Sequence, residues 1–400
     1  MSLPIRVLDN PAKKLQEGQG TGKPAHWVDA QGSKFHNPWP SFRPNDVSDR
    51  FHMVGLVRQF PAPPKAPIVP IRKPTWGEES DGTDRTEQIK ATWLGHACFL
   101  IELPSRSKEH RGARILFDPV WSDRCSPSQW MGPKRFSPPP CKIEDIPEID
   151  AIVISHNHYD HLDTHTITTL FKRKRTPHVF APLGNGDYFK SLCIPTSHTH
   201  IMDWWDSKRI EVSIPSTASD DKSTSKSSEN KVIVDVSCTP GQHFTGRSLF
   251  DNFKSLWASW VVEEVLPEGR QVGRAPVKAY FAGDTGYRTV RDGQDENNVP
   301  TCPAFKEIGE KFGGFDFAMI PIGAYMPRQY MSPIHCAPQD SVLLFKDVKA
   351  KKALGMHWAT WILTTEDVTE PPKRLAEECK RVGIEDGAFN ICDIGETLFF

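Results

Sequence analysis

The stretch that decides the fold is IVISHNHYDH, residues 152–161, where an apolar run is followed by four polar side chains of metal-ligand type. The β-branched residues at its start predict a buried strand. Three imidazoles and one carboxylate then leave the end of this strand within a single turn. These groups would crowd one pocket at high energetic cost unless a cation offset them. The sequence therefore predicts a metal site at a strand end.

This arrangement resembles the metallo-β-lactamase superfamily, in which two metal sites lie side by side at the edge of a four-layer αββα sandwich. The resemblance implies an α/β fold of that kind and further ligands after other strands. The sequence supplies three such residues in the superfamily's order. His243 follows the apolar alternation at 232–234, while Asp284 and His357 each follow an apolar run.

The ligand types indicate the chemistry. Imidazole and carboxylate ligands without a thiolate suit zinc, although iron or manganese tolerates the same set. An aspartate shared by two cations holds them roughly 3.5–4 Å apart and lets a water ionise near neutral pH. That water is the expected nucleophile, so no Ser-His-Asp set or activated cysteine is required.

Segments outside the ligands narrow the resemblance to the N-acyl-phosphatidylethanolamine-hydrolysing phospholipases D. The most specific of them is SPSQWMGPKRF, residues 126–136. The others are residues 92–97, 117–119, 155–163, 283–287 and 320–325, with an outlying match at 37–40. The similarity covers most of the chain from about residue 92 to residue 400.

The resemblance assigns roles to individual residues of this chain. The first zinc would be held by His156, His158 and His243, and the second by Asp160, His161 and His357, with Asp284 shared between them as a catalytic residue. His335 matches a catalytic histidine that also contacts the substrate phosphate, and Gln129 matches a substrate-contacting glutamine. Tyr159 and Arg247 are further predicted substrate contacts.

This chain departs from the family pattern after His243. Animal members carry an aromatic residue, then Cys-Lys-Arg, whereas this chain has Phe-Thr-Gly-Arg at 244–247. Gly246 therefore stands in the place of a lysine that would meet an anionic phosphate. Ile334 likewise stands where those members have a glutamine.

Composition predicts one large domain with an extension. A chain of 400 residues that is 38% hydrophobic can bury a substantial core. Residues 1–86 are predicted to be a Pro-rich N-terminal extension, and residues 87–400 the catalytic domain with a polar insertion at 216–230. The aromatic residues of the extension could pack on the catalytic domain, pair across a dimer or touch lipid: Phe35, Trp39, Phe42 and Phe51.

The balance of positive and negative residues indicates which classes of partner the protein binds. Lys and Arg number 49 against 50 Asp and Glu, without a long basic block, which argues against nucleic-acid binding. Nine cysteines without regular spacing or a signal peptide indicate reduced thiols in an intracellular protein, cytoplasmic or membrane-associated. No apolar run approaches the roughly 18–20 residues that span a bilayer, so contact with a phospholipid membrane is expected to be peripheral. Relatives add homodimerisation and a mitochondrial association as expectations.

Several aromatic and polar residues have two open interpretations. The tryptophans could fill the core or line an acyl channel: Trp204, Trp205, Trp257, Trp260, Trp358 and Trp361. Asp163 could accept the free ring N–H of His161 and Asp118 that of another ligand, or both could cap turns. His96 is expected to be a structural residue under the site, not a ligand.

The function expected from the resemblance is zinc-dependent hydrolysis of N-acyl-phosphatidylethanolamine to an N-acylethanolamine and phosphatidic acid. The superfamily alternative is hydrolysis of another ester, lactone or thioester, since a dimetal centre polarises any such carbonyl. The alternative from another class is a non-catalytic lipid-binding protein with a structural metal.

Overall fold

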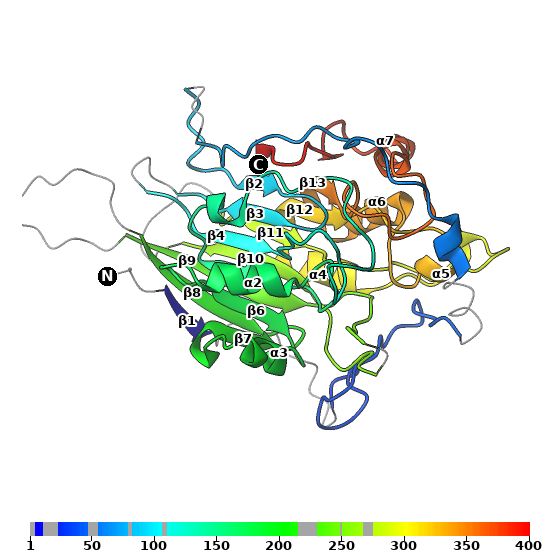
Figure 1. Ribbon diagram of the computed structural model, residues 1–400, viewed down its shortest axis with the longest axis horizontal. Coiled ribbons are helices and arrows are strands. Elements are labelled where there is room, and N and C mark those ends of the chain that lie inside the picture. Colours follow the sequence, from blue (N-terminus) through cyan, green and yellow to red (C-terminus); the bar gives the residue numbers. More distant parts are fainter. Residues whose placement is uncertain are drawn as a thin grey trace, which may run out of the picture.

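Two β-sheets packed face to face form the centre of the protein (Figure 1). The computed structural model describes residues 5–10, 23–46, 55–78, 82–105, 110–214, 230–248, 250–266 and 275–400. The predicted polar insertion lies outside these residues except for Asn230, and Phe51 also lies outside them. No helix in the described part of the chain is long and apolar enough to cross a membrane.

The larger sheet has eight strands in the order β1-β8-β9-β10-β11-β12-β13-β14. Neighbours from β1 to β11 are antiparallel, and those from β11 to β14 are parallel. The strands are β1 (Ile5–Asp9), β8 (Ser207–Ile214), β9 (Asn230–Thr239), β10 (Ser259–Val265), β11 (Lys278–Phe281), β12 (Phe315–Pro321), β13 (Ala350–Met356) and β14 (Phe389–Asn390).

The smaller sheet has seven strands in the order β15-β2-β3-β4-β5-β6-β7. It is antiparallel from β15 to β4 and parallel from β4 to β7. The strands are β15 (Thr397–Phe399), β2 (Lys90–Trp93), β3 (Phe99–Glu102), β4 (Arg114–Phe117), β5 (Ala151–Val153), β6 (His178–Pro182) and β7 (Thr199–Met202).

Helices cover the outer faces of both sheets, as the αββα prediction requires. The helices are α2 (Thr164–Phe171), α3 (Gly186–Ser191), α4 (Ala304–Phe312), α5 (Arg328–Met331), α6 (Pro338–Asp347) and α7 (Glu370–Arg381), with short 3-10 helices η2 (Val57–Gln59), η3 (Ile143–Asp145), η4 (Thr196–His198) and η5 (Glu296–Asn298). Helices α2 and α3 lie over the smaller sheet, while α6 contacts β12 and β13 of the larger one (Figure 1). The fold prediction is confirmed.

Strand alternation divides the core into two clusters. On β4 and β5, Phe117 and Val153 face the other sheet, whereas Leu116 and Ile152 face α2. Successive side chains of a strand point to opposite faces, so strands buried on both sides are apolar throughout. This explains the continuous apolar run before His156.

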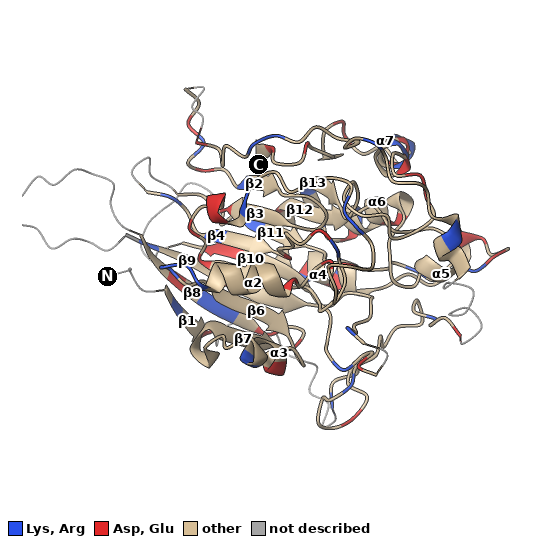
Figure 2. Cartoon of the chain, viewed as in Figure 1, with Lys and Arg blue, Asp and Glu red and all other residues tan. Residues whose placement is uncertain are grey.

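The N-terminal extension takes part in the same sandwich. Strand β1 pairs with the edge strand β8, with Ile5 opposite Val212. Phe35 is fully buried, and Trp39 stacks on Trp204 with ring centroids 5.4 Å apart. For these two aromatic residues, packing on the catalytic domain is therefore confirmed. Basic and acidic residues are interspersed around the fold (Figure 2), in line with the balanced composition.

The carboxyl ends of several parallel strands meet at one edge of the sandwich. Strands β4, β5, β11 and β13 are each followed by polar residues at this edge. Gly283, directly after β11, has φ 59° and lies so close to Ser155 that an added Cβ would be 2.7 Å from the Cβ of Ser155. Glycine permits this close approach of the two sheets, and the polar residues of both meet there.

Candidate metal centre

Three histidines from two loops form the first half of the site. His156 and His158 follow β5, and His243 follows β9. The Nε2 atom of His156 lies 2.8 Å from Nδ1 of His158, which in turn lies 3.3 Å from Nε2 of His243. All three residues offer nitrogen atoms within 4.8 Å of one another, which is a spacing that one cation can bridge.

A carboxylate and two more histidines form the second half. Asp160 Oδ2 lies 3.6 Å from Nε2 of both His161 and His357. Asp284, after β11, lies between the halves. Its Oδ2 atom is 3.0 Å from His357 Nε2 and 3.2 Å from His161 Nε2, and 3.8 Å from His243 Nε2.

The unpaired buried atoms of this cluster fit a divalent cation. Among the described residues, no hydrogen bond reaches Nε2 of His161, Nε2 of His357 or Oδ1 of Asp284, and all three atoms are buried. A buried polar atom without a partner destabilises the fold by about 1–3 kcal/mol. A metal ion bound by these imidazole and carboxylate atoms would satisfy them together, so the donor set fits the predicted cofactor.

Electrostatics keeps the carboxylate ionised. Burial opposes a charge on Asp284, but His161 and His357 hold its pKa well below the usual range. Burial likewise disfavours the cation of His357, whereas Asp284 raises the pKa of His357 to about 9. Opposite charges at this separation in a buried site stabilise each other, and a metal ion bound by Asp284 and His357 would take the place of the imidazole proton.

Known proteins are similar to this chain in both fold and sequence. The profile of the β-lactamase superfamily domain matches residues 113–358, more than half of the chain. N-acyl-phosphatidylethanolamine-hydrolyzing phospholipase D 1 of Caenorhabditis elegans is 35% identical over 311 residues, 76% of this chain and 74% of the relative. This chain therefore belongs to the N-acyl-phosphatidylethanolamine-hydrolysing phospholipase D family of the metallo-β-lactamase superfamily. It is an enzyme of the metallohydrolase class.

Two further likenesses extend the comparison. The mitochondrial N-acyl-phosphatidylethanolamine-hydrolyzing phospholipase D of Saccharomyces cerevisiae is 28% identical over 407 residues, 92% of this chain and 75% of the relative. The structure of a possible metal-dependent hydrolase from Veillonella parvula covers 78% of this chain and 99% of its own, with a TM-score of 0.50 and 15% identity. The second likeness concerns the fold alone.

Asp118 orients the metal ligands of the smaller sheet. It directly follows β4 and accepts a hydrogen bond of 2.6 Å from Nδ1 of His161. It also accepts from the backbone N–H and the hydroxyl of Ser155, whose oxygen lies 2.9 Å from Nδ1 of His156. One carboxylate thus fixes two imidazole rings, one directly and one through a hydroxyl, with Nε2 of each ring facing the centre.

The partner of His161 differs from the one that the sequence suggested. Asp163 lies near His161 in the chain, but its carboxylate caps α2 and accepts from His165 N and Thr166 Oγ1. The capping interpretation is therefore correct for Asp163, and the ligand-orienting one for Asp118. Parallel pairing of β4 with β5 brings Asp118 next to the ligand loop, which sequence separation conceals.

His96 lies beside the second half of the site and is close enough to Asp160, His161 and His357 to hold an ion with them, so its assignment as a structural residue outside the ligand set stays a prediction. Its Nε2 atom is 3.0 Å from Asp160 Oδ2, and its ring centroid is 4.0 Å from that of His357. His96, Asp118 and His357 all have positive φ, at 50°, 38° and 65°. Such backbone conformations cost on the order of 1–3 kcal/mol each, and their concentration here is typical of a functional site.

His335 follows α5 and faces the shared aspartate. Its Nδ1 atom lies 3.8 Å from Asp284 Oδ2, and no hydrogen bond from a described residue reaches it. His243, Asp284 and His335 also lie close enough together to hold an ion. The assignment of His335 as a catalytic residue outside the ligand set therefore stays a prediction.

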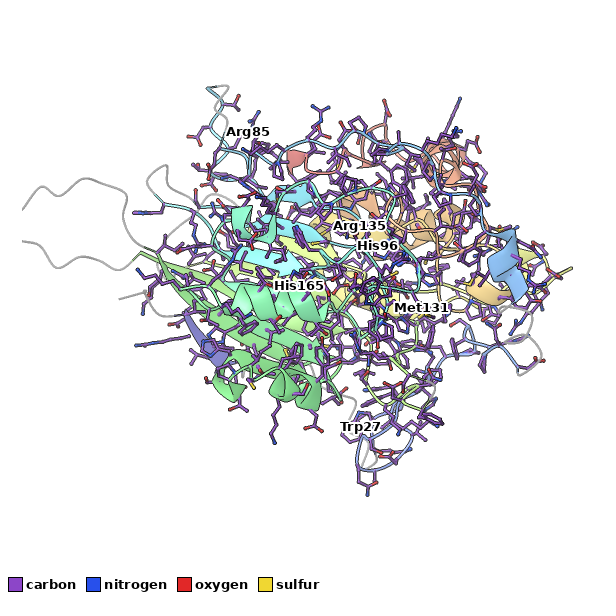
Figure 3. The ribbon with its side chains drawn as sticks, in the orientation of Figure 1. Trp27, Arg85, His96, Met131, Arg135 and His165 are labelled. Atoms are coloured by element: carbon purple, nitrogen blue, oxygen red, sulfur yellow. The ribbon has the colours of Figure 1, made fainter. Side chains whose placement is uncertain are left out.

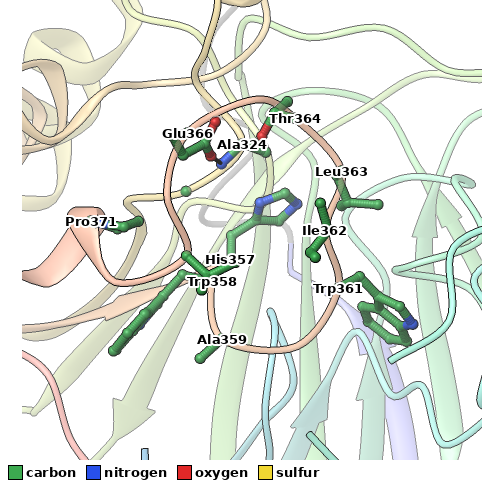
Figure 4. A pocket seen from close by; sticks show the side chains of 12 residues that line it. Ala324, His357, Trp358, Ala359, Trp361, Ile362, Leu363, Thr364, Glu366 and Pro371 are labelled. Carbon is green, nitrogen blue, oxygen red and sulfur yellow. Dashed lines mark hydrogen bonds between the residues drawn. The ribbon is translucent and has the colours of Figure 1, made fainter. Parts of the chain in front are cut away.

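A small cavity opens beside His357. Figure 4 shows it lined by Trp358, Trp361 and Ile362, with the carboxylate of Glu366 on the opposite wall. Its volume of about 30 Å³ suits one or two water molecules, not an acyl chain. Trp358 and Trp361 are buried beside the site, so the core interpretation holds for these two in this conformation.

The predicted substrate contact Gln129 belongs to a closed surface loop, residues 124–134. Its side-chain amide accepts from the backbone N–H of Arg124 and donates to the carbonyl of the same residue, at 3.0 Å each. The loop is tied to the site through Trp361, which donates to the carbonyl of Asp123 and meets the ring of His96 edge-on. A substrate contact by Gln129 stays a prediction.

Arg247 holds the ligand loop. Its guanidinium donates to the carbonyls of Asn157 and Leu162, at 2.9 and 2.8 Å, and lies 3.8 Å from the ring centroid of Tyr159. The Tyr159 hydroxyl donates to the carbonyl of Arg247 in return. Tyr159 and Arg247, the two predicted substrate contacts, therefore contact each other. Through these contacts they stabilise the segment that carries His158, Asp160 and His161.

Gly246 has a backbone conformation that residues with a side chain rarely adopt. Its φ is 154°, and an added Cβ would lie 2.5 Å from Oδ1 of Asn252. Introducing a lysine at this position would therefore strain the loop, whatever its effect on phosphate binding.

We expect Arg247→Lys to weaken the metal centre. A single ammonium on a flexible stem cannot reproduce the planar fork, so the loop should be destabilised by about 1.5–3 kcal/mol. Elemental analysis should show reduced metal content, and thermal unfolding a lower midpoint, while Arg381→Lys on the exposed surface should change neither. Normal metal content with a raised KM would instead make Arg247 a substrate contact.

Proposed function

We propose that this protein is a zinc-dependent phosphodiesterase that hydrolyses N-acyl-phosphatidylethanolamine to an N-acylethanolamine and phosphatidic acid, with two zinc ions per chain. The observation that carries the proposal is the convergence of two ligand groups on Asp284, at 3.0–3.8 Å from imidazoles of both. The names of the worm and yeast relatives supply the substrate.

The ligand groups divide the metal-binding work. His156, His158 and His243 would hold one ion, and Asp160, His161 and His357 the other, with Asp284 between them. Zinc in such a site acts as a Lewis acid toward phosphoryl oxygens and activates water near neutral pH. Asp118 and Ser155 keep the imidazole rings in place, so little reorganisation is needed when the substrate phosphate arrives.

His335 is the residue we propose for proton handling. Its ring lies 5.1 Å from the rings of both His243 and His357, centroid to centroid, so it borders both halves. Its unpaired Nδ1 atom can hydrogen-bond a phosphate oxygen or exchange a proton with the departing ethanolamine oxygen. Phosphorus–oxygen cleavage at that oxygen leaves phosphatidic acid.

Product analysis tests the function. Incubation of the purified protein with a mixed phospholipid extract should yield N-acylethanolamines and phosphatidic acid by mass spectrometry. Removal of metal with a chelator should abolish the reaction, and added zinc should restore it. Release of fatty acids or opening of lactones would favour the carboxyl-ester alternative, and metal-dependent lipid binding without turnover would favour the lipid-binding protein.

We expect His335→Ala to lower kcat by about 100-fold or more, the usual contribution of a positioned acid or base. Its metal content should remain that of the wild type, because six ligands and Asp284 are unchanged. Loss of one metal equivalent in elemental analysis would show that His335 is a ligand.

Peripheral membrane contact is part of the proposal, since the substrate resides in a bilayer. The closed loop of residues 124–134 presents Trp130 and Met131, which are 91% and 73% exposed. Figure 3 labels Met131, Arg135 and His96. The guanidinium of Arg135 lies 4.6 Å from the centroid of the Trp361 ring, and that ring contacts the ring of His96. An aromatic residue beside an apolar one on a hydrogen-bonded loop suits insertion at the headgroup level.

The double variant Trp130→Ser with Met131→Ser should bind vesicles of phosphatidylcholine and phosphatidylethanolamine at least about 10-fold more weakly, since burying each side chain contributes more than 1 kcal/mol. Val57→Ser removes an exposed apolar residue from another segment and serves as the control. Unchanged co-sedimentation of the double variant, or an equal loss in the control, would contradict this role for the loop.

Homodimerisation and association with mitochondria complete the proposal. The name of the yeast relative supports the second. Light scattering in solution tests the first, with a monomer as the contrary result, and subcellular fractionation tests the second.

A further inference from the structure

A segment of the N-terminal extension, residues 35–45, contacts the loop that carries His243. We refer to it as the strap. Phe35, Asn37 and Ser41 are buried in it, although the strap ends more than one hundred residues before the first ligand, His156. Burial of an asparagine and a serine requires polar partners, and both partners belong to the loop that carries a metal ligand.

The strap bonds directly to the His243 loop. The side-chain amide of Asn37 donates to the backbone carbonyl of His243 at 2.8 Å. The hydroxyl of Ser41 donates to Oε1 of Gln242 at 2.6 Å. Gln242 and His243 are adjacent, so two side chains of the strap hold two consecutive residues of the loop.

Gln242 connects this contact to the other catalytic segments. Its side-chain amide donates to the carbonyl of Pro333 at 2.9 Å, two residues before His335. Its backbone N–H donates to the hydroxyl of Thr285, and its carbonyl accepts from Gly286 N at 2.7 Å, just after Asp284. Nδ1 of His243 lies 2.7 Å from the carbonyl of Ile334. The loops carrying His243, Asp284 and His335 therefore share one hydrogen-bond network with the strap.

The strap is anchored independently at both ends. Upstream, Asp203 accepts hydrogen bonds from the rings of His26 and Trp27, at 2.7 and 2.9 Å. Downstream, the guanidinium of Arg291 donates to the backbone carbonyls of Arg43 and Pro44, at 3.2 and 3.0 Å. Because the chain is fixed on both sides of the strap, the strap can hold the residues that it contacts in a fixed position.

We propose that Asn37 and Ser41 are positioning residues of the metal centre, which hold the Gln242–His243 backbone so that Nε2 of His243 faces the first metal. The Nδ1 contact with Ile334 sets the rotation of the His243 ring, and the Asn37 contact sets the position of the backbone from which the ring projects. The inference rests on the metal centre of the proposed function, but not on its substrate.

The experiment compares full-length Asn37→Asp, Asn37→Ala and Asn45→Ala with the wild type. Ionised aspartate has the shape of asparagine but cannot donate to the His243 carbonyl, and alanine removes the amide without adding a charge, so a loss common to both variants reports the hydrogen bond. Asn45 is the matched control, because its amide also donates to a backbone carbonyl from the strap, that of Tyr330. Zinc affinities are measured by competition with a chromophoric chelator, and cobalt-loaded proteins by visible absorption.

We expect both Asn37 variants to bind one of two zinc equivalents about 10–100-fold more weakly, the usual effect of losing a residue that orients a ligand. The cobalt spectrum of that site should change, while Asn45→Ala should keep both affinities and the wild-type spectrum. Wild-type affinities in Asn37→Asp, or an equal loss in Asn45→Ala, would overturn the proposal.

Two further measurements keep the outcome decisive. If Asn37→Ala fails to fold by circular dichroism, Ser41→Ala, which removes a single hydroxyl, takes its place with the same expected weakening of one metal site. A wild type that binds two metals without cleaving N-acyl-phosphatidylethanolamine would contradict the proposed substrate and leave the strap test intact. A wild type that cleaves it, with Asn37→Asp unchanged in metal affinity, would contradict the strap alone.

Discussion

The buried carboxylate of Asp284 is the interaction on which the site depends. Imidazoles from both sheets lie within 4 Å of it, and their combined effect keeps it ionised despite its burial. An isolated buried charge would be strongly unfavourable, so the surrounding loops must be held in register for the cluster to exist. The close approach of Gly283 to Ser155 and the shared carboxylate of Asp118 provide that register.

The resemblance to the metallo-β-lactamase superfamily predicted the sandwich, and the chain positions of the cluster could be predicted because each ligand segment is a local signal. Apolar strands end in polar ligand-type residues at β5, β11 and β13, and each ligand follows its strand within a few residues. The structure brings all seven predicted ligand residues together at one edge. That the ions are zinc and that there are two of them is proposed from the chemistry of these ligands.

Longer-range contacts could not be predicted in the same way. Asp163 is close to His161 in sequence, but Asp118 reaches it through the pairing of neighbouring strands. Arg247 carried the charge expected of a phosphate ligand, whereas the fold turns its guanidinium toward backbone carbonyls. Asn37 belongs to the outlying family match at 37–40, but neither that match nor Ser41 indicated a contact with the site, because their partners lie about 200 positions away. Such roles depend on which segments the fold makes adjacent.

We expect two metal ions, one on either side of Asp284. Anomalous diffraction from crystals of the zinc-loaded protein, at wavelengths above and below the zinc edge, would locate them. Two peaks are expected, one among His156, His158 and His243 and the other among Asp160, His161 and His357, with Asp284 between them. A single peak, or a pair away from Asp284, would contradict this expectation.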